Sequence, residues 1–311
     1  MKNFKIIILS IVILLLTIEL LKIVKYMNSF QRIQIINNKF KKIMVIIPMG
    51  GIGNRLQFIN STYKLANNLK RKLYVIWPVN HECKIHYNQI FNYPKLNFYN
   101  EKYVPLSDKI YYNYESNIKY IPKTFKNYSK HSINKIHLDN SNVVFFCDFI
   151  YKKFDSDLLH RELLPTNLVK DKINKLIPKN KKILGIHIRC SDRLDCLNNS
   201  ILNKIYRNIS RIKKMYPNHY LFLATDDKNI KEKLVSDFNL NAQNNILTEN
   251  NNNKINIIRN TQNGMIDAIV ELFILAYSDI ILYLNLKSTF TKSAIKIGNI
   301  QKNKQFLINV K

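Results

Sequence analysis

The chain is poor in the residues on which disulfide-rich, metal-binding and acidic proteins depend. Its 311 residues include four cysteines, six glycines and one tryptophan, and 21 acidic residues stand against 49 lysines and arginines. Four cysteines cannot make a disulfide scaffold in a chain of this size, and their spacing shows no Cys-x-x-Cys metal pattern. We therefore expect neither a structural metal nor a metal cofactor, and the fold must rest on a hydrophobic core.

The excess of basic residues gives a formal net charge of +28 at pH 7. These residues are spread along the chain instead of forming one stripe, and the sequence has no basic helix, zinc pattern or aromatic–basic motif of the usual nucleic-acid-binding modules. We expect no nucleic-acid partner. A field of this sign still attracts nucleoside diphosphates, anionic lipid surfaces and acidic glycans.

The N-terminus carries a long apolar run. Residues 6–21 are almost wholly apolar, and the span 4–24 comes close to the about 20 residues that cross a bilayer. The run therefore predicts a single-pass membrane anchor at 4–24, followed by a stem at 25–42. A cleaved signal peptide is the main alternative, although no small-x-small cleavage site follows, and an amphipathic surface helix is another. The flank after the run is the more basic one, which argues against a luminal catalytic domain.

The densest polar cluster directly follows an apolar segment of strand type. Residues 181–188 alternate and then fill with β-branched side chains, which predicts a buried strand, and Arg189 begins the polar run RCSDR. Ligands of open α/β sheets bind beyond strand ends of this kind. A guanidinium there offers a planar fork of donors to a diphosphate, and Ser191 and Asp192 can hydrogen-bond a sugar hydroxyl or an acceptor proton.

A second cluster lies in a glycine loop between a predicted strand and a predicted helix. Residues 42–48 are apolar, the run MGGIGNR follows, and residues 56–69 repeat apolar side chains at helical spacing. Glycines permit close backbone approach, and amides at a helix start favour an anion, although an ordinary tight turn looks the same. A third glycine of the dinucleotide fingerprint is missing, which disfavours NAD. The candidate contact residues are Gly51, Gly53, Asn54 and Arg55.

Polar residues also follow the apolar segment 220–224, where Asp226 and Asp227 either contact a ligand or cap the next helix. The segment 265–277 predicts a long apolar helix with Asp267 and Glu271 one turn apart on the same face. Because apolar residues surround it, we expect Glu271 to be partly buried and paired.

The last predicted helix starts after a strand at 280–284, with Thr289, Phe290 and Thr291 in its first turn. Backbone amides and hydroxyl groups at such a start can close around a phosphate, and the same residues can serve only as an N-cap.

Together these clusters resemble, from about residue 43 to 300, the GDP-fucose-dependent fucosyltransferases of the α1,6, nodulation-factor and protein O-linked type. The segment from His187 to Arg193 is similar to the His-x-Arg-Arg-Thr-Asp-Lys element of that family, with Cys190 in place of the second arginine. The glycine loop resembles its Gly-Gly-x-Gly-Asn-Arg opening, and the later clusters resemble its Ala-Thr-Asp-Asp turn and its Thr-Phe-Ser-Ser helix start.

The resemblance implies an α/β fold of the GT-B type, with two Rossmann-like domains facing a cleft. Residues 43–175 would form the acceptor-side domain and residues 176–311 the domain that binds the nucleotide sugar. In the family the first arginine of the element holds the donor pyrophosphate, a role that falls here on Arg189, and the helix carboxylate that reads guanine falls on Glu271. A carboxylate accepts two hydrogen bonds from guanine N1 and N2, which favours GDP over UDP.

The implied reaction is inverting transfer of fucose from GDP-fucose to a hydroxyl of a glycan or glycoprotein, without a metal ion. Arg189 would stabilise the leaving phosphate, and Asp192 would help to accept or orient the acceptor proton. A transferase for another sugar nucleotide and an inactive, membrane-anchored glycan or protein binder are the alternatives. The expected donor-binding residues are Gly51, Gly53, Asn54, Arg55, His187, Arg189, Asp226, Asp227, Glu271, Thr289, Phe290 and Thr291.

Two questions about the remaining residues stay open at this level. Membrane-tethered relatives of animals face the lumen of the secretory pathway, which implies the same side here, against the charge flanking the anchor. A bridge between Cys190 and Cys196 would then clamp the arginine loop, whereas in a reducing compartment each would be a free thiol.

His81, Glu82, Cys83 and His86 look like a metal cluster, but they lack a second ligand group, and we interpret them as a loop.

Overall fold

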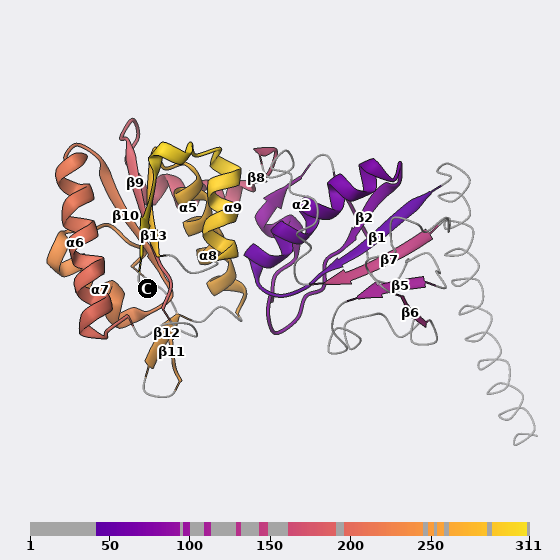
Figure 1. The fold of residues 1–311 in the computed structure, drawn as a ribbon, viewed down its shortest axis with the longest axis horizontal. Helices are drawn as coiled ribbons and strands as arrows, with labels where there is room; N and C mark the ends of the chain where they lie inside the picture. Colours follow the sequence, from indigo (N-terminus) through magenta and orange to yellow (C-terminus); the bar gives the residue numbers. More distant parts are fainter. Residues whose placement is uncertain are drawn as a thin grey trace, which may run out of the picture.

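A computed structural model describes two α/β units that lie side by side (Figure 1). The described residues are 42–93, 96–99, 109–112, 129–131, 143–148, 161–190, 196–244, 248–251, 254–257, 261–284 and 288–309. We call the described part up to residue 165 the N-terminal unit and the part from residue 166 the C-terminal unit. Each unit contains a parallel sheet of its own, six-stranded in the first and four-stranded in the second.

The N-terminal unit is built on a parallel sheet with the strand order β4-β2-β1-β7-β5-β6. Its central strand β1 (Ile43–Pro48) is buried along its whole length and pairs with β2 (Lys72–Ile76) and β7 (Val143–Asp148). A strand covered on both faces reads as a continuous apolar run, which is what IMVIIP is. The other elements are α2 (Ile52–Asn68), α3 (Tyr87–Ile90), β3 (Phe91–Asn92), β4 (Asn97–Tyr99), β5 (Lys109–Tyr112), β6 (Ser129–His131) and β8 (Leu164–Pro165).

The C-terminal unit has the strand order β10-β9-β13-β14, all parallel. Its central strand β9 (Ile183–Ile188) lies between β10 (Tyr220–Thr225) and β13 (Ile280–Leu284), and β14 (Gln305–Ile308) forms the edge. A separate antiparallel pair consists of β11 (Thr248–Asn251) and β12 (Lys254–Ile257). The helices are α5 (Asn167–Leu176), α6 (Asn199–Met215), α7 (Lys228–Phe238), α8 (Gln262–Ala276), α9 (Thr289–Gly298) and the short 3-10 helix η5 (Lys302–Lys304).

Side-chain caps fix where the helices of the C-terminal unit begin. Asn198 accepts a hydrogen bond from the Ser200 amide at the start of α6, Thr261 does so from the Gly264 amide in α8, and Asp227 caps α7. Each cap satisfies a backbone donor that has no partner inside the helix. The strand-to-helix turns are therefore fixed at the carboxyl ends of the strands.

One apolar core connects the two units. Buried side chains from β1, α2 and α8 belong to one continuous cluster. At the boundary, the Phe91 ring of β3 meets the Phe273 ring of α8 edge to face, with ring centroids 6.1 Å apart. The start of α2 also packs against the start of α9, as Figure 1 shows. The units are thus fixed to each other by buried surface.

The elements predicted around the candidate residues are confirmed. The strand expected at 280–284 is β13, the helix expected at 265–277 is α8, and the glycine loop connects β1 to α2. The predicted boundary at 175 falls inside α5, which lies against α8 through an ion pair between Lys172 and Asp267, 2.8 Å long.

The anchor predicted at 4–24 lies outside the described residues, as does the stem except for Lys42. Within the part that the structure describes, no helix has the length and the hydrophobicity to cross a bilayer.

Candidate functional site

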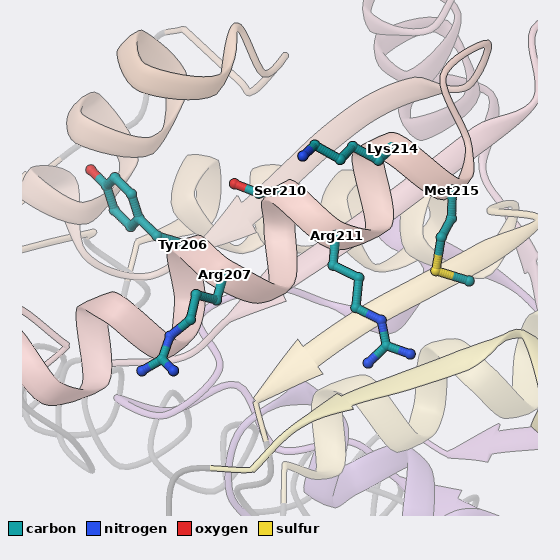
Figure 2. A pocket seen from close by; sticks show the side chains of 6 residues that line it. All are labelled: Tyr206, Arg207, Ser210, Arg211, Lys214 and Met215. Carbon is teal, nitrogen blue, oxygen red and sulfur yellow. The ribbon is translucent and has the colours of Figure 1, made fainter.

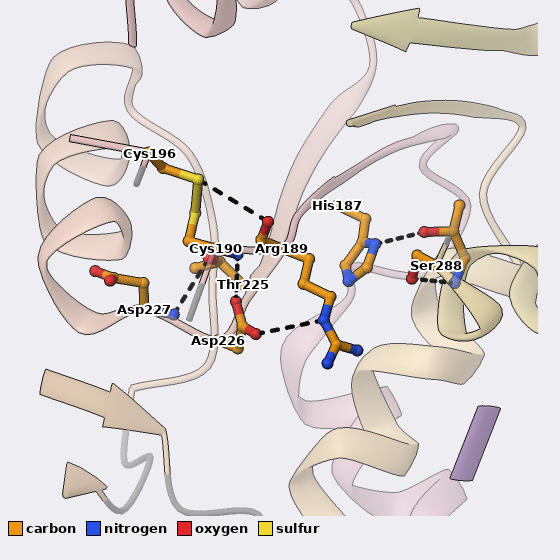
Figure 3. A network of polar contacts seen from close by, with 9 residues as sticks. His187, Arg189, Cys190, Cys196, Thr225, Asp226, Asp227 and Ser288 are labelled. Atoms are coloured by element: carbon orange, nitrogen blue, oxygen red, sulfur yellow. Dashed lines mark hydrogen bonds and ion pairs between the residues drawn. A yellow bond between two sulfur atoms is a disulfide. The ribbon is translucent and has the colours of Figure 1, made fainter. Parts of the chain in front are cut away.

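The carboxyl ends of β9 and β10 bring two predicted clusters together. Ile188 at the end of β9 is level with Thr225 at the end of β10, so Arg189 and Asp226 leave the sheet side by side. Figure 3 shows both side chains at this edge of the sheet. Parallel strands end at one edge, and that edge is where open α/β sheets bind ligands.

Asp226 binds the backbone of the arginine segment and lies near its guanidinium. Its carboxylate accepts a hydrogen bond from the Cys190 amide at 2.8 Å and lies 4.0 Å from Nε of Arg189. Asp226 is buried, whereas 21% of the Arg189 side chain is exposed. A hydrogen bond to a charged group contributes about 1.5–3 kcal/mol. Asp226 therefore fixes the backbone of the arginine segment and places an opposite charge near the guanidinium, part of which stays accessible to a ligand.

A disulfide closes the segment after Arg189. Cys190 and Cys196 are bridged, with their Cα atoms 5.6 Å apart, and both side chains are buried. The bridge is one of the two states that the sequence left open. The bridged sulfur of Cys196 lies 3.9 Å from the Arg189 carbonyl oxygen, and since it carries no proton this is a packing contact. Asp192, the predicted proton acceptor, lies outside the described residues, so its role stays a prediction.

His187 connects the end of β9 to the start of α9. Its Nδ1 lies 2.5 Å from Oγ1 of Thr291, and its ring lies 5.3 Å from that of Phe290. The Ser288 side chain caps α9 by accepting from the Thr291 amide at 3.3 Å. His187 and Thr291 are both buried. The two predicted donor-binding segments therefore touch, and the contact holds the first turn of α9 beside Arg189.

Asp227 has a local role in the structure. Its carboxylate accepts from the Ile230 amide at 3.0 Å and caps α7. The cap interpretation of the sequence thus describes Asp227, whereas Asp226 belongs to the arginine cluster. A contact between Asp227 and a nucleotide stays a prediction.

The glycine loop (Gly50 to Gly53) contains residues with different roles. Gly50 has a φ of 79°, which favours glycine, and Gly51 is exposed with free space around its Cα. A Cβ at Gly53 would lie 2.5 Å from the Phe290 nitrogen and 2.6 Å from the Thr289 carbonyl carbon. Gly53 therefore allows the starts of α2 and α9 to meet, and Gly51 is the glycine with room for a ligand.

Asn54 strengthens the same contact between the units, which we call the junction. Its Oδ1 accepts a hydrogen bond from the Thr289 hydroxyl at 2.8 Å. One turn later, Gln57 donates to the Ser293 hydroxyl at 3.3 Å. The junction thus combines close backbone packing with polar contacts, and it lies next to the His187–Thr291 pair.

The Arg55 guanidinium is committed to the protein itself. Nε donates to the Gly50 carbonyl at 2.6 Å, Nη1 to the Pro78 carbonyl at 2.6 Å, and Nη2 to Oδ1 of Asn80 at 3.0 Å. The group also lies 4.9 Å from the centre of the Trp77 ring, and Arg55 is fully buried. This geometry favours a role in holding the glycine loop over the predicted direct contact with a donor.

The segment 78–86 is a loop, as predicted, but it is tied to the glycine loop. Asn80 Oδ1 accepts from the amides of Glu82 and Cys83, and the Gly50 amide donates to Glu82 Oε2 at 3.0 Å. The Cys83 thiol is buried, and burial raises its pKa although Arg55 lowers it. Among the described residues, no group of three or more metal-ligating side chains forms a site. Nothing in the sequence indicated the Glu82–Gly50 contact, because 32 positions separate the two residues.

Glu271, buried on α8 as expected, lies near a half-buried cation. Its charge raises the pKa of Lys231 in α7, although burial has the larger effect and leaves that pKa below its usual value. Lys231 also donates to the Gln243 carbonyl, and Gln243 donates to the Asp267 carbonyl of α8 at 2.8 Å. Whether Glu271 reads a base thus stays a prediction.

A separate open depression of about 520 Å³ lies along α6 (Figure 2). Its lining side chains all come from this one helix and include no predicted site residue. The lining residues are Tyr206, Arg207, Ser210, Arg211, Lys214 and Met215. Because its walls come from a single helix, the strand ends and the junction remain the better candidate site.

No model of a known protein family matches the sequence. No curated protein matches it significantly either. Solved structures do match. POFUT1 in complex with GDP-fucose aligns with a TM-score of 0.59 and 12% identity, over 86% of this chain and 98% of that one. The NodZ α-1,6-fucosyltransferase soaked with GDP-fucose gives 0.59 and 16%, over 83% and 93%.

Two further matches agree with these. NodZ from Bradyrhizobium aligns with a TM-score of 0.56 and 16% identity, over 82% of this chain and 93% of that one. A mutant of Arabidopsis thaliana FUT1 in complex with GDP gives 0.55 and 12%, over 90% and 74%. At these identities the likeness shows a shared fold. The resemblance that the motifs predicted is thereby confirmed for the fold, with parallel α/β units like those of GT-B fucosyltransferases.

Proposed function

We propose that this chain is a glycosyltransferase that transfers fucose from GDP-fucose to a hydroxyl of a glycan or protein, with inversion and without a metal ion. The observation that carries the proposal is Arg189, a partly exposed guanidinium beside Asp226 at the carboxyl end of β9, in a segment whose backbone Asp226 binds. Structures that share the fold were obtained with GDP-fucose or GDP, which supports a GDP-sugar donor.

The chemistry of such a transfer explains why a fixed cation is needed. Breaking the bond between the sugar and the β-phosphate leaves negative charge on the departing GDP. A hydrogen-bond donor of the protein that is already in place where this charge develops accelerates such a step by about 10²–10³-fold. Arg189 is suited to this task, because Asp226 and the neighbouring bridge restrict its segment before any ligand binds.

The remaining donor contacts follow from the geometry around Arg189. The nucleotide lies across the ends of β9 and β10, with its phosphates between Arg189 and the first turn of α9. The open space at Gly51 allows the glycine loop to close on the donor from the N-terminal unit. Glu271 accepts hydrogen bonds from guanine in this arrangement.

A transferase for another sugar nucleotide is the second candidate. The observation that favours it is the electrostatic effect of Glu271 on the half-buried Lys231, because a carboxylate that interacts with a lysine is less available to guanine. An inactive glycan or protein binder is a third, since Cys190 stands where the resembling motif has another arginine and is committed to a disulfide.

The proposal includes attachment to a membrane. Residues 4–24 form the single-pass anchor, 25–42 the stem, and the catalytic units face the lumen of the secretory pathway. The Cys190–Cys196 bridge supports this side, because disulfides persist in oxidising compartments and are rare in the cytosol.

The test uses the full-length chain purified in detergent. Its melting temperature is measured with GDP, UDP and ADP at equal concentration, and release of GDP from GDP-fucose is followed in parallel. A ligand at about 100 times its Kd stabilises the native state by about 2.7 kcal/mol. We expect stabilisation by GDP and slow GDP release. Stabilisation by UDP alone would refute the guanine assignment, and GDP binding without any turnover would favour the inactive binder.

A further inference from the structure

Glu82 presents a carboxylate at the glycine loop. Its Oε2 accepts a hydrogen bond from the Gly50 amide at 3.0 Å, and among the described residues none donates to Oε1. Glu82 is half-buried, so one oxygen is anchored while the group stays within reach of a ligand. The function proposed above gives this residue no role.

The Glu82 carboxylate is held by a closed set of contacts. Asn80 Oδ1 accepts from the Glu82 amide at 3.0 Å and from Nη2 of Arg55 at 3.0 Å. Arg55 in turn donates to the Gly50 carbonyl, and Gly50 donates to Glu82. A group that takes up a proton in the transition state works best when the protein already holds it in position. These contacts provide such positioning.

Glu82 and Arg189 lie on opposite sides of the junction. The glycine loop leads into α2, and Gly53 in the first turn of α2 touches the first turn of α9. Thr291 of that turn contacts His187, which is two residues before Arg189. Glu82 thus belongs to the acceptor-side unit and Arg189 to the donor-side unit, with the starts of the two helices between them.

Inversion determines which of these sides can supply a base. The acceptor oxygen attacks the sugar carbon on the face opposite the leaving phosphate, and a base that takes its proton must lie on that opposite face. Arg189 marks the side of the phosphate. Asp192, the other candidate base, follows Arg189 by three positions in the sequence and lies outside the described residues. Glu82 comes from the other unit.

We propose that Glu82 is the general base of the transfer, an inference that rests on the function proposed above. Oε1 of Glu82 takes the proton of the acceptor hydroxyl as the acceptor oxygen bonds to C1 of the sugar. The bond between C1 and the β-phosphate oxygen breaks, and its electron pair leaves with GDP, whose charge Arg189 neutralises. Glu82 is left as a neutral acid and returns its proton to water.

The substitution Glu82→Gln separates this role from a purely structural one. The amide oxygen of glutamine can still accept the Gly50 hydrogen bond, but it cannot take a proton. With water as the acceptor, GDP release from GDP-fucose should fall about 10²–10⁴-fold, the range for loss of general acid–base catalysis. The affinity for GDP and the melting temperature should stay unchanged. Glu232→Gln, at an exposed position of α7, is the matched control.

A second variant tests the chemistry directly. Glu82→Ala should lose the same activity, and sodium formate should restore part of it, because formate supplies the missing carboxylate. A structural role predicts no such rescue. Asp192→Asn, measured in parallel, should keep most of the rate.

Three outcomes would overturn the inference: full activity of Glu82→Gln, an equal loss of GDP affinity and rate in that variant, or loss of the rate in Asp192→Asn alone. Failure of the proposed function looks different, because the wild-type chain itself would then neither bind GDP nor release it from GDP-fucose.

Discussion

Gly53 is the position where one added methyl group should push the starts of α2 and α9 apart. In Gly53→Ala the new Cβ would meet the Phe290 nitrogen at 2.5 Å, the Thr289 carbonyl carbon at 2.6 Å and the Thr289 hydroxyl at 2.8 Å. Two of these atoms belong to the backbone and cannot rotate away. The start of α9 must therefore move relative to α2.

The cost can be estimated from the contacts that are lost. Overpacking of a well-packed site costs about 1–3 kcal/mol. Moving α9 also stretches the hydrogen bond between Asn54 and Thr289, 2.8 Å long, which contributes about 0.5–1.5 kcal/mol. Alanine recovers at most about 1 kcal/mol through its higher helix propensity. The net destabilisation is about 0.5–4.5 kcal/mol, or a fall in melting temperature of roughly 1–9 °C at about 2 °C per kcal/mol.

The matched control is Gly51→Ser. Nothing lies within 4 Å of a Cβ at Gly51, its φ of −68° suits any residue, and serine is a favoured N-cap. Its stability should equal or slightly exceed that of the wild type. Both variants are compared by thermal unfolding, and GDP affinity is measured by calorimetry. An unchanged melting temperature in Gly53→Ala would refute the close approach of α2 and α9.

Three further perturbations test the site and the fold. Arg189→Ala should lower GDP release from GDP-fucose by about 10²–10³-fold, while Arg207→Ala on the exposed face of α6 should leave it unchanged; equal rates would refute the role of Arg189. Replacing both Cys190 and Cys196 by serine should lower the free energy of unfolding by about 2 kcal/mol and weaken GDP binding. If calorimetry showed an unchanged affinity for GDP, the disulfide would not be what positions the Arg189 segment. Burial lowers the pKa of His219 below its usual 6.5, so the unfolded chain binds that proton first and stability is lost as the pH falls below about 6.5. His219→Gln should therefore flatten the decline of the melting temperature between about pH 7 and pH 5, and an unaltered decline would contradict this.

The strand ends of the C-terminal unit could be predicted because their signals are local. Apolar runs of strand length bounded by polar residues identify β9 and β10 in the sequence itself. In a parallel sheet, such ends meet at one edge whatever the details of packing. The proximity of Arg189 and Asp226 follows from this rule, and the structure adds that Asp226 binds the backbone of the arginine segment.

The division of roles within the glycine loop could not be predicted. The sequence treats Gly51, Gly53 and Arg55 alike, since all three belong to one motif. Their roles differ because α9, more than 230 positions away in the chain, covers Gly53 and leaves Gly51 open. The carbonyl groups that engage Arg55 also come from different segments. Such partners are visible only after folding.

Glu82 was missed for a related reason. In the sequence it stands among His81, Cys83 and His86, which suggests metal ligands more readily than a partner of Gly50. Its contact depends on the turn that Asn80 imposes and on the path of β2 beside β1. Single-sequence patterns carry no signal for such a pairing.

The edge-to-face contact between Phe91 and Phe273 has a consequence for how this protein can evolve. Modular shuffling requires halves that can be cut apart and recombined, each with a polar outer surface. Here either unit, expressed alone, would expose an apolar surface that the other unit normally covers, and it should aggregate. A change of ligand specificity should therefore arise more easily by point substitutions within an intact chain, because grafting a foreign half would mismatch the shared hydrophobic contact surface.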